Sequence, residues 1–150
     1  MLPLPPFKTK VLSSENLSLT MPLKITLKPG EKMIVSGAVV TNGSNLRCEL
    51  LINNNAPVLR EKDILAEKDA TTPCSRIYFT IQLMYIDHEN RKIHADTYWR
   101  MVGELLKAVP SLTGLIDQIS ENIVNGRYYQ ALKQAGDLME YEQEILGNVR

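Results

Sequence analysis

The fold is decided by the stretch EKDATTPCSRIYFTIQLMYID at residues 67–87, where a polar run leads directly into an apolar one. Thr71 and Thr72 are both suitable N-cap residues, and Pro73 suits the first turn of a helix, where a missing N–H costs no hydrogen bond. Beyond the cap, apolar residues recur at helical spacing, so the sequence predicts a helix with a buried face. The residues on that face are Ile77, Ile81, Met84 and Tyr85. This pattern predicts structure and by itself says nothing of function.

Three further helices are predicted towards the C-terminus. The second follows the junction after residue 87 and stops at Pro110. The third ends at Asn125-Gly126, where glycine suits a left-handed C-terminal cap. The fourth runs from Tyr128 to Leu146.

Towards the N-terminus, residues 22–60 show the two-residue period of antiparallel strands. Leu23, Ile25 and Leu27 alternate with polar residues. Asn42-Gly43 is a strong hairpin signal, strand alternation resumes at residues 46–52, and residues 58–59 suit a last short strand. The sequence therefore predicts an α+β fold, with a small antiparallel sheet of hairpins followed by a bundle of about four helices at residues 62–147.

The length of 150 residues suits a single domain, which we place at residues 21–150. Residues 1–20 are rich in proline and serine, and we interpret them as a loose extension. The alternative is a short edge strand through residues 10–12. The extension should be dispensable for the stability of the rest.

Charge excludes a global attraction to nucleic acid, because lysine plus arginine equals aspartate plus glutamate. The distribution is nevertheless uneven, with a net charge of +3 at residues 22–60 and −3 from residue 110 onward. This asymmetry allows an anionic partner on one side. No stretch is apolar enough to span a membrane, and the proline-broken start is a poor secretory signal, so we expect a cytoplasmic protein.

Catalytic and metal sites are disfavoured by spacing. Cys74 and His88 are separated by about 21 Å along one predicted helix, which prevents a thiol–imidazole pair within it. The position of Cys74 in a first turn favours a lowered pKa of its thiol, and the alternative is a small packed residue after a proline. His88 and His94 are six residues apart, whereas metal ligands on helices are spaced by three or four. We expect neither an enzyme nor a cofactor.

The best nucleic-acid candidates lie on the predicted strands. Alternation places Lys24, Lys28 and Arg47 on the outer face, and Lys32 and Arg60 lie nearby in sequence. These side chains suit phosphate contacts. The alternative is that water-exposed strand faces carry basic residues in any case. No aromatic side chain lies between residues 7 and 78, so the sheet lacks the stacking platform of common RNA modules.

Protein-partner candidates lie in the helices. Trp99 flanks the apolar stripe of its helix, as a rim or anchor residue does. Arg127 and Tyr129 begin the last helix, where they suit either a partner or packing within the helical hairpin.

The wording of three segments resembles the FlbT family of flagellum biosynthesis regulators, over roughly residues 21–146. These segments are DATTP followed by IYF and IQ at residues 69–82, LKPGEK at residues 27–32 with GAVV at 37–40, and NGRYYQALK at residues 125–133. The resemblance implies a post-transcriptional regulator of flagellin that associates with the 5′ untranslated region of flagellin mRNA and affects its stability and translation. It supplies no catalytic residues, and some relatives are activators.

A second class of function stays open beside the first. In it the chain is a protein-interaction or chaperone-like factor that binds flagellin or another flagellar regulator through its helices, with indirect effects on RNA. Balanced charge and the lack of stacking aromatics favour this class, whereas the family resemblance favours RNA. A homo-oligomer is compatible with both.

Overall fold

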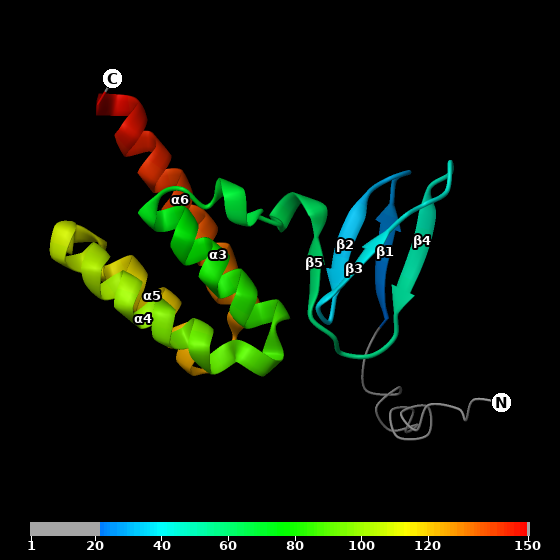
Figure 1. The fold of residues 1–150 in the computed structure, drawn as a ribbon, viewed down its shortest axis with the longest axis horizontal. Helices are drawn as coiled ribbons and strands as arrows, with labels where there is room; N and C mark the ends of the chain where they lie inside the picture. The colour runs from blue at the N-terminus through cyan, green and yellow to red at the C-terminus, as the bar shows by residue number, and fades with distance from the viewer. Residues whose placement is uncertain (1–21, 150) are drawn as a thin grey trace. The chain divides into compact units, whose positions relative to one another are not determined.

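The structure is a computed structural model that describes residues 22–149. The expectations for residues 1–20, including the strand at residues 10–12, lie outside the described residues. The chain separates into two compact units with the boundary between Glu61 and Lys62. The described part of the first unit is built of strands and the second of helices, which confirms the α+β class (Figure 1).

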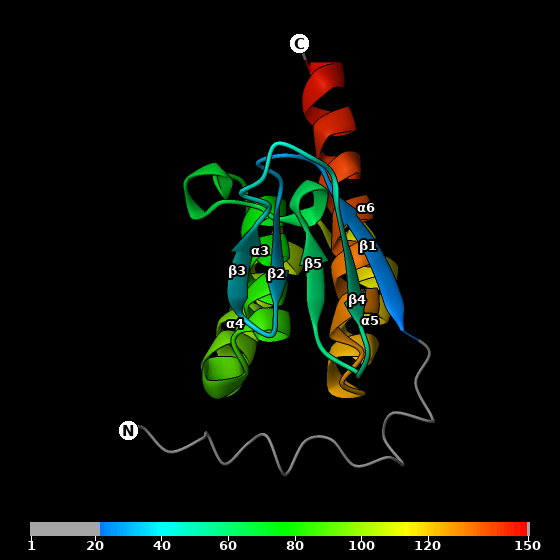
Figure 2. The same ribbon diagram turned by 90° about the vertical axis from the view of Figure 1, so that its right-hand side faces the viewer.

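The β unit holds two small antiparallel sheets (Figure 2). Strand β1 pairs with β4, and strand β2 lies between β3 and β5. The bounds are β1 Leu23–Leu27, β2 Lys32–Val35, β3 Ala38–Thr41, β4 Cys48–Ile52 and β5 Val58–Arg60.

Both sheets contribute to one apolar core in this unit. Ile25 and Leu27 of β1 are buried together with Met33 of β2 and Val58 of β5. Partly buried neighbours from three strands complete the cluster, namely Val35 of β2, Val40 of β3, and Leu50 and Ile52 of β4. The predicted alternation is confirmed within β1 and β4, where Ile25, Leu27, Leu50 and Ile52 face inward. It does not extend to the predicted ends, because Leu23 and Leu46 are 44% and 76% exposed.

The hairpin predicted at Asn42-Gly43 is wrong. The tight turn lies at Ser36-Gly37, and these two residues connect β2 to β3. Their φ values are positive, 49° and 86°, as a two-residue hairpin turn requires. Asn42 is instead buried, and its side chain bonds to loop and strand backbone. The chain after β3 therefore leaves that sheet, and β4 pairs with β1.

The helical unit contains four α-helices among the described residues. They are α3 Pro73–Ile86, α4 Arg91–Ala108, α5 Thr113–Val124 and α6 Tyr128–Val149. Short 3₁₀ turns lie between or before them, at Glu61–Asp63, Glu67–Asp69, His88–Asn90 and Pro110–Leu112. Figures 1 and 2 show the last turns of α6 extending beyond the other helices.

Two predicted helix ends are confirmed. Thr72 caps α3 in a capping box with Ser75, and Pro73 takes the first turn. Gly126 has a φ of 75° after α5, and the Arg127 N–H donates to the Asn122 carbonyl at 2.8 Å. The Gly126 N–H also donates to the Ile123 carbonyl at 3.1 Å, and the two bonds together form a Schellman motif, after which the chain turns into α6.

Helix α3 is the centre of this unit, because it packs against both α4 and α6, while α5 packs against α6. Three residues of its predicted face, Ile77, Ile81 and Met84, are fully buried. The other helices present matching apolar side chains, among them Tyr98, Val102, Ile116, Ile119, Ile123, Leu132 and Leu138.

Candidate functional site

Three of the five predicted phosphate-contacting residues follow one row. Lys24 lies opposite Leu51 on the exposed face of the β1–β4 pair. Lys28 directly follows β1 and Arg47 directly precedes β4. Because Leu27 lies opposite Cys48, Lys28 and Arg47 lie at the same end of the β1–β4 pair. All three side chains are exposed, although Lys24 Nζ lies 3.3 Å from Glu49 Oε2. We call Lys24, Lys28 and Arg47 the basic row.

Lys32 and Arg60 do not join the basic row, because they belong to the other sheet. Lys32 lies opposite Thr41, and its ammonium group donates to Thr41 Oγ1 at 3.1 Å. Arg60 lies opposite Met33, the residue next to Lys32. Since successive residues of a strand face opposite sides, Lys32 and Arg60 lie on opposite faces of that sheet.

The three predicted partner residues have different surroundings. Trp99 is 43% exposed on α4 and packs edge-on against Tyr98 at 5.0 Å between ring centroids. Arg127 Nε donates to Asn122 Oδ1 at 2.8 Å, which stabilises the turn between α5 and α6. The ring of Tyr129 lies 5.7 Å from that of Tyr85 on α3. Arg127 and Tyr129 thus support the packing of their own unit.

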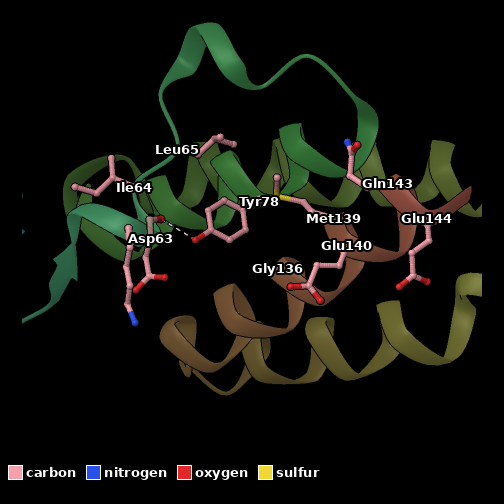
Figure 3. Close-up of a pocket in the computed structure, with 10 residues that line it drawn as sticks. Asp63, Ile64, Leu65, Tyr78, Gly136, Met139, Glu140, Gln143 and Glu144 are labelled. Atoms are coloured by element: carbon pink, nitrogen blue, oxygen red, sulfur yellow. Dashed lines mark hydrogen bonds between the residues drawn. The ribbon is translucent and has the colours of Figure 1, made fainter. Parts of the chain in front are cut away.

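A groove in the helical unit was not predicted from the sequence. It has a volume of about 540 Å³ and lies between the segment before α3, α3 itself and α6 (Figure 3). Its lining residues are Lys62, Asp63, Ile64, Leu65, Tyr78, Gly136, Met139, Glu140, Gln143 and Glu144. We call this cavity the α6 groove.

Side chains of α3 hold the wall of the α6 groove in place. The Tyr78 hydroxyl donates to the Asp63 carbonyl at 2.7 Å, as the dashed line in Figure 3 shows. Gln82 is buried, and its amide bonds to both the N–H and the carbonyl of Leu65, at 2.8 and 2.9 Å. A Cβ atom at Gly136 would lie 3.9 Å from the Tyr78 ring, which is ordinary van der Waals contact, so a larger side chain at this position would extend into the groove.

The rim of the α6 groove is acidic. Glu140 and Glu144 are exposed one turn apart on α6, and Asp63 lies 3.7 Å from Lys133 Nζ. Burial, and secondly the nearby Asp63 carboxylate, raises the pKa of Tyr78 to about 12. A groove with apolar walls and an acidic rim suits a basic, apolar segment of a protein.

A second cavity of about 330 Å³ lies between α3 and α4. Arg76 of α3 and Arg100 of α4 both line it, and so does Glu104. Apolar side chains complete the lining, namely Pro73, Met101, Leu105 and Ala108. We call it the arginine pocket.

The environment of Cys74 makes it a packed residue and not a nucleophile. Its side chain is buried, and burial together with Glu142 raises the pKa of the thiol to about 12. Glu142 of α6 accepts from the Cys74 N–H at 3.1 Å and from the Thr72 hydroxyl at 2.5 Å. This carboxylate thus stabilises the N-terminus of α3.

His94 contacts an acid and not a second histidine. Its Nε2 lies 2.9 Å from Asp87 Oδ2, and this hydrogen bond, with a second from Asn90, lowers the pKa of Asp87. His88 is exposed in the adjacent 3₁₀ turn. The contacts of His94 and Asn90 with the Asp87 carboxylate connect the start of α4 to the end of α3.

The geometry defines an α+β protein with a basic strand row and two helical cavities, in which no helix among the described residues is long and apolar enough to cross a membrane. The family described as flagellar protein FlbT matches residues 23–146, so the chain belongs to the FlbT family. This finding confirms the resemblance seen in the sequence.

Curated relatives of the chain are named as repressors. A probable flagellum biosynthesis repressor protein FlbT 1 of Bradyrhizobium diazoefficiens is 44% identical over 85% of this chain and 86% of the relative. A probable flagellum biosynthesis repressor of Caulobacter sp. strain K31 is 42% identical over 86% of this chain and 99% of its own. The flagellum biosynthesis repressor protein FlbT of Caulobacter vibrioides strain CB 15 is 41% identical over 86% of this chain and 92% of the relative. No solved structure matches the chain significantly.

Proposed function

We propose that this protein is a cytoplasmic, non-enzymatic repressor of flagellum biosynthesis that binds the 5′ untranslated region of flagellin mRNA and lowers its stability and translation. Membership of the FlbT family and the names of its relatives support the regulatory role. The nuclease that degrades the message is a separate protein in this scheme.

The observation that carries direct RNA contact is the basic row. Lys24, Lys28 and Arg47 are exposed along one strand pair, in the unit with a positive net charge. Lys28 and Arg47 lie at one end of the pair and Lys24 towards the other, so the row offers phosphate contacts at both ends. Leu51 is 56% exposed beside Lys24 and offers the only large apolar side chain of this face among the described residues.

The test is binding of purified protein to a flagellin leader RNA in a salt titration. Replacing all three residues of the basic row with glutamine should weaken binding at least about tenfold and reduce the salt slope by about 2, because each lost single-strand phosphate contact removes about 0.7. The melting temperature should stay nearly constant, since these side chains are exposed. Unchanged affinity and slope in the folded triple variant would eliminate the basic row.

The α6 groove favours a second candidate function, docking of a protein partner such as flagellin or another flagellar regulator. Its apolar walls, acidic rim and hydrogen-bonded frame support a preformed peptide site. Gly136→Leu should fill the groove and abolish binding of purified flagellin, whereas Gly103→Leu, at an exposed glycine of α4 with open space around it, should not. Equal binding by both variants would remove the groove from consideration.

A further inference from the structure

We infer that the arginine pocket is a second RNA contact, which takes one nucleotide with its phosphate on the two guanidinium groups and its base or sugar on the apolar floor. This inference rests on the proposed function and adds a contact on the helical unit. The residues that carry it are Arg76 and Arg100, which share the lining of the pocket with Glu104 and with the apolar side chains of Met101, Leu105 and Ala108.

Both guanidinium groups are available to a ligand. Arg76 makes no side-chain hydrogen bond or ion pair with any described residue. Arg100 lies 3.9 Å from Glu104, but these side chains are 65% and 69% exposed, so water screens the pair. Arginine binds phosphate through two parallel hydrogen bonds, which makes two arginines from different helices a suitable clamp.

The size and floor of the pocket favour a nucleotide over an acidic side chain. A volume of about 330 Å³ lies at the lower end of the range for small-ligand sites. An Asp or Glu side chain would satisfy the guanidinium groups and leave the apolar floor uncovered. An unstacked nucleotide of single-stranded RNA can contact the guanidinium groups with its phosphate and the apolar lining with its flat base.

The charge variant tests the phosphate contact. In the full chain, Arg76→Gln with Arg100→Gln should weaken binding of the flagellin leader RNA and reduce the salt slope by about 0.7, for one lost phosphate contact. The matched control is Lys68→Gln with Lys92→Gln, which removes the same charge from exposed positions outside the pocket. Equal losses in the two double variants would overturn the inference, because the effect would then be one of net charge.

A filling variant tests the pocket floor. Ala108 is exposed at the end of α4, so Ala108→Leu should fold normally and occupy the cavity. RNA binding should weaken several-fold with an unchanged salt slope, because no charge is lost. Unaltered affinity would overturn the nucleotide pocket even if the arginines contribute to binding.

The remaining outcomes separate this inference from the proposed function. If the wild type does not bind the RNA at low salt, both fail. If the basic-row variant loses binding while the arginine variant keeps it, only the pocket fails. If a polyglutamate peptide binds the wild type and not the arginine variant, with RNA binding equal in both, the pocket serves an acidic protein and the inference is wrong.

Discussion

At the scale of single residues, one buried amide joins separate segments of the β unit. Asn42 Nδ2 donates to the Leu27 carbonyl at 3.0 Å and to the Leu46 carbonyl at 2.8 Å. Its Oδ1 accepts from both the N–H and the hydroxyl of Ser44. All the hydrogen-bonding capacity of this side chain is therefore used, and it fixes the passage from β3 to β4.

Asn42→Ala should destabilise the protein by about 1–3 kcal/mol, because two carbonyl groups lose their donors and the turn loses its acceptor. Asn42→Asp should cost more, since a carboxylate would face two carbonyl oxygens. The measurement is chemical denaturation, and Asn45→Ala, at an exposed position of the same loop, is the control. Equal stability of the Asn42 and Asn45 variants would contradict the bridging role.

The buried Tyr98 and the half-buried Tyr78 predict how stability depends on alkaline pH. Burial is the largest cause that raises the pKa of Tyr78 and of Tyr98 from 10.0 to about 12. A raised pKa means that the folded state prefers the neutral phenol, so this stabilisation is complete below pH 10 and is lost as the pH rises to about 12. Melting temperatures should therefore fall across that interval.

The control for this pH dependence is Tyr78→Phe. It removes one of the two raised groups, along with the hydrogen bond to Asp63. The variant should be less stable at neutral pH and should lose less stability between pH 10 and about 12. An alkaline decline as steep as that of the wild type would show that Tyr78 is not responsible.

At the scale of elements, α3 carries the packing of the helical unit, so a charge on its buried face should be poorly tolerated. Ile81 is fully buried, and Ile81→Asp would place an unpaired carboxylate there at a cost of more than about 4 kcal/mol. We expect an insoluble or unfolded chain, measured by solubility and circular dichroism. Gln118→Asp on the exposed face of α5 should fold normally. A cooperatively folding Ile81 variant would disprove the packing of α3.

Local signals predicted the helices and strands well, because caps and periodicity act within a few residues. The Thr72 hydroxyl caps the start of α3, and Gly126, which has no Cβ atom, takes the positive φ that follows α5. Strand partners were harder, because the Asn42-Gly43 signal describes a local turn preference and the buried hydrogen bonds of Asn42 override it. The sequence alone also left open which strands share a sheet.

The cavities escaped prediction because their walls are distant in sequence. The α6 groove joins Asp63, Tyr78 and Gly136, and only folding brings these together. Two signals in the sequence were available: a glutamine on the apolar face of α3, at Gln82, and a glycine inside α6. A buried amide requires hydrogen-bond partners, and a glycine inside a helix often has a packing or functional reason.

At the scale of the whole molecule, charge is divided between the units. Residues 22–61 carry a net charge of +2 and residues 62–150 carry −3. RNA binding by this chain must therefore depend on local clusters, because the net field of the molecule is not attractive. The basic row and the arginine pocket are two such clusters, one in each unit.

The slope of log affinity against log salt measures how many phosphates of one RNA the protein contacts, and so whether the RNA engages one cluster or both. Three phosphates on the basic row give a slope of log affinity against log salt of about −2, and one more at the arginine pocket brings it to about −2.8. We expect a slope of about −2.8 for the wild type, about −2 for the arginine variant, and about −0.7 for the basic-row variant. A wild-type slope near −2 that the arginine variant leaves unchanged would confine RNA to the β unit. A slope near zero would remove phosphate contact from both units and leave the α6 groove, with a protein partner, as the functional surface.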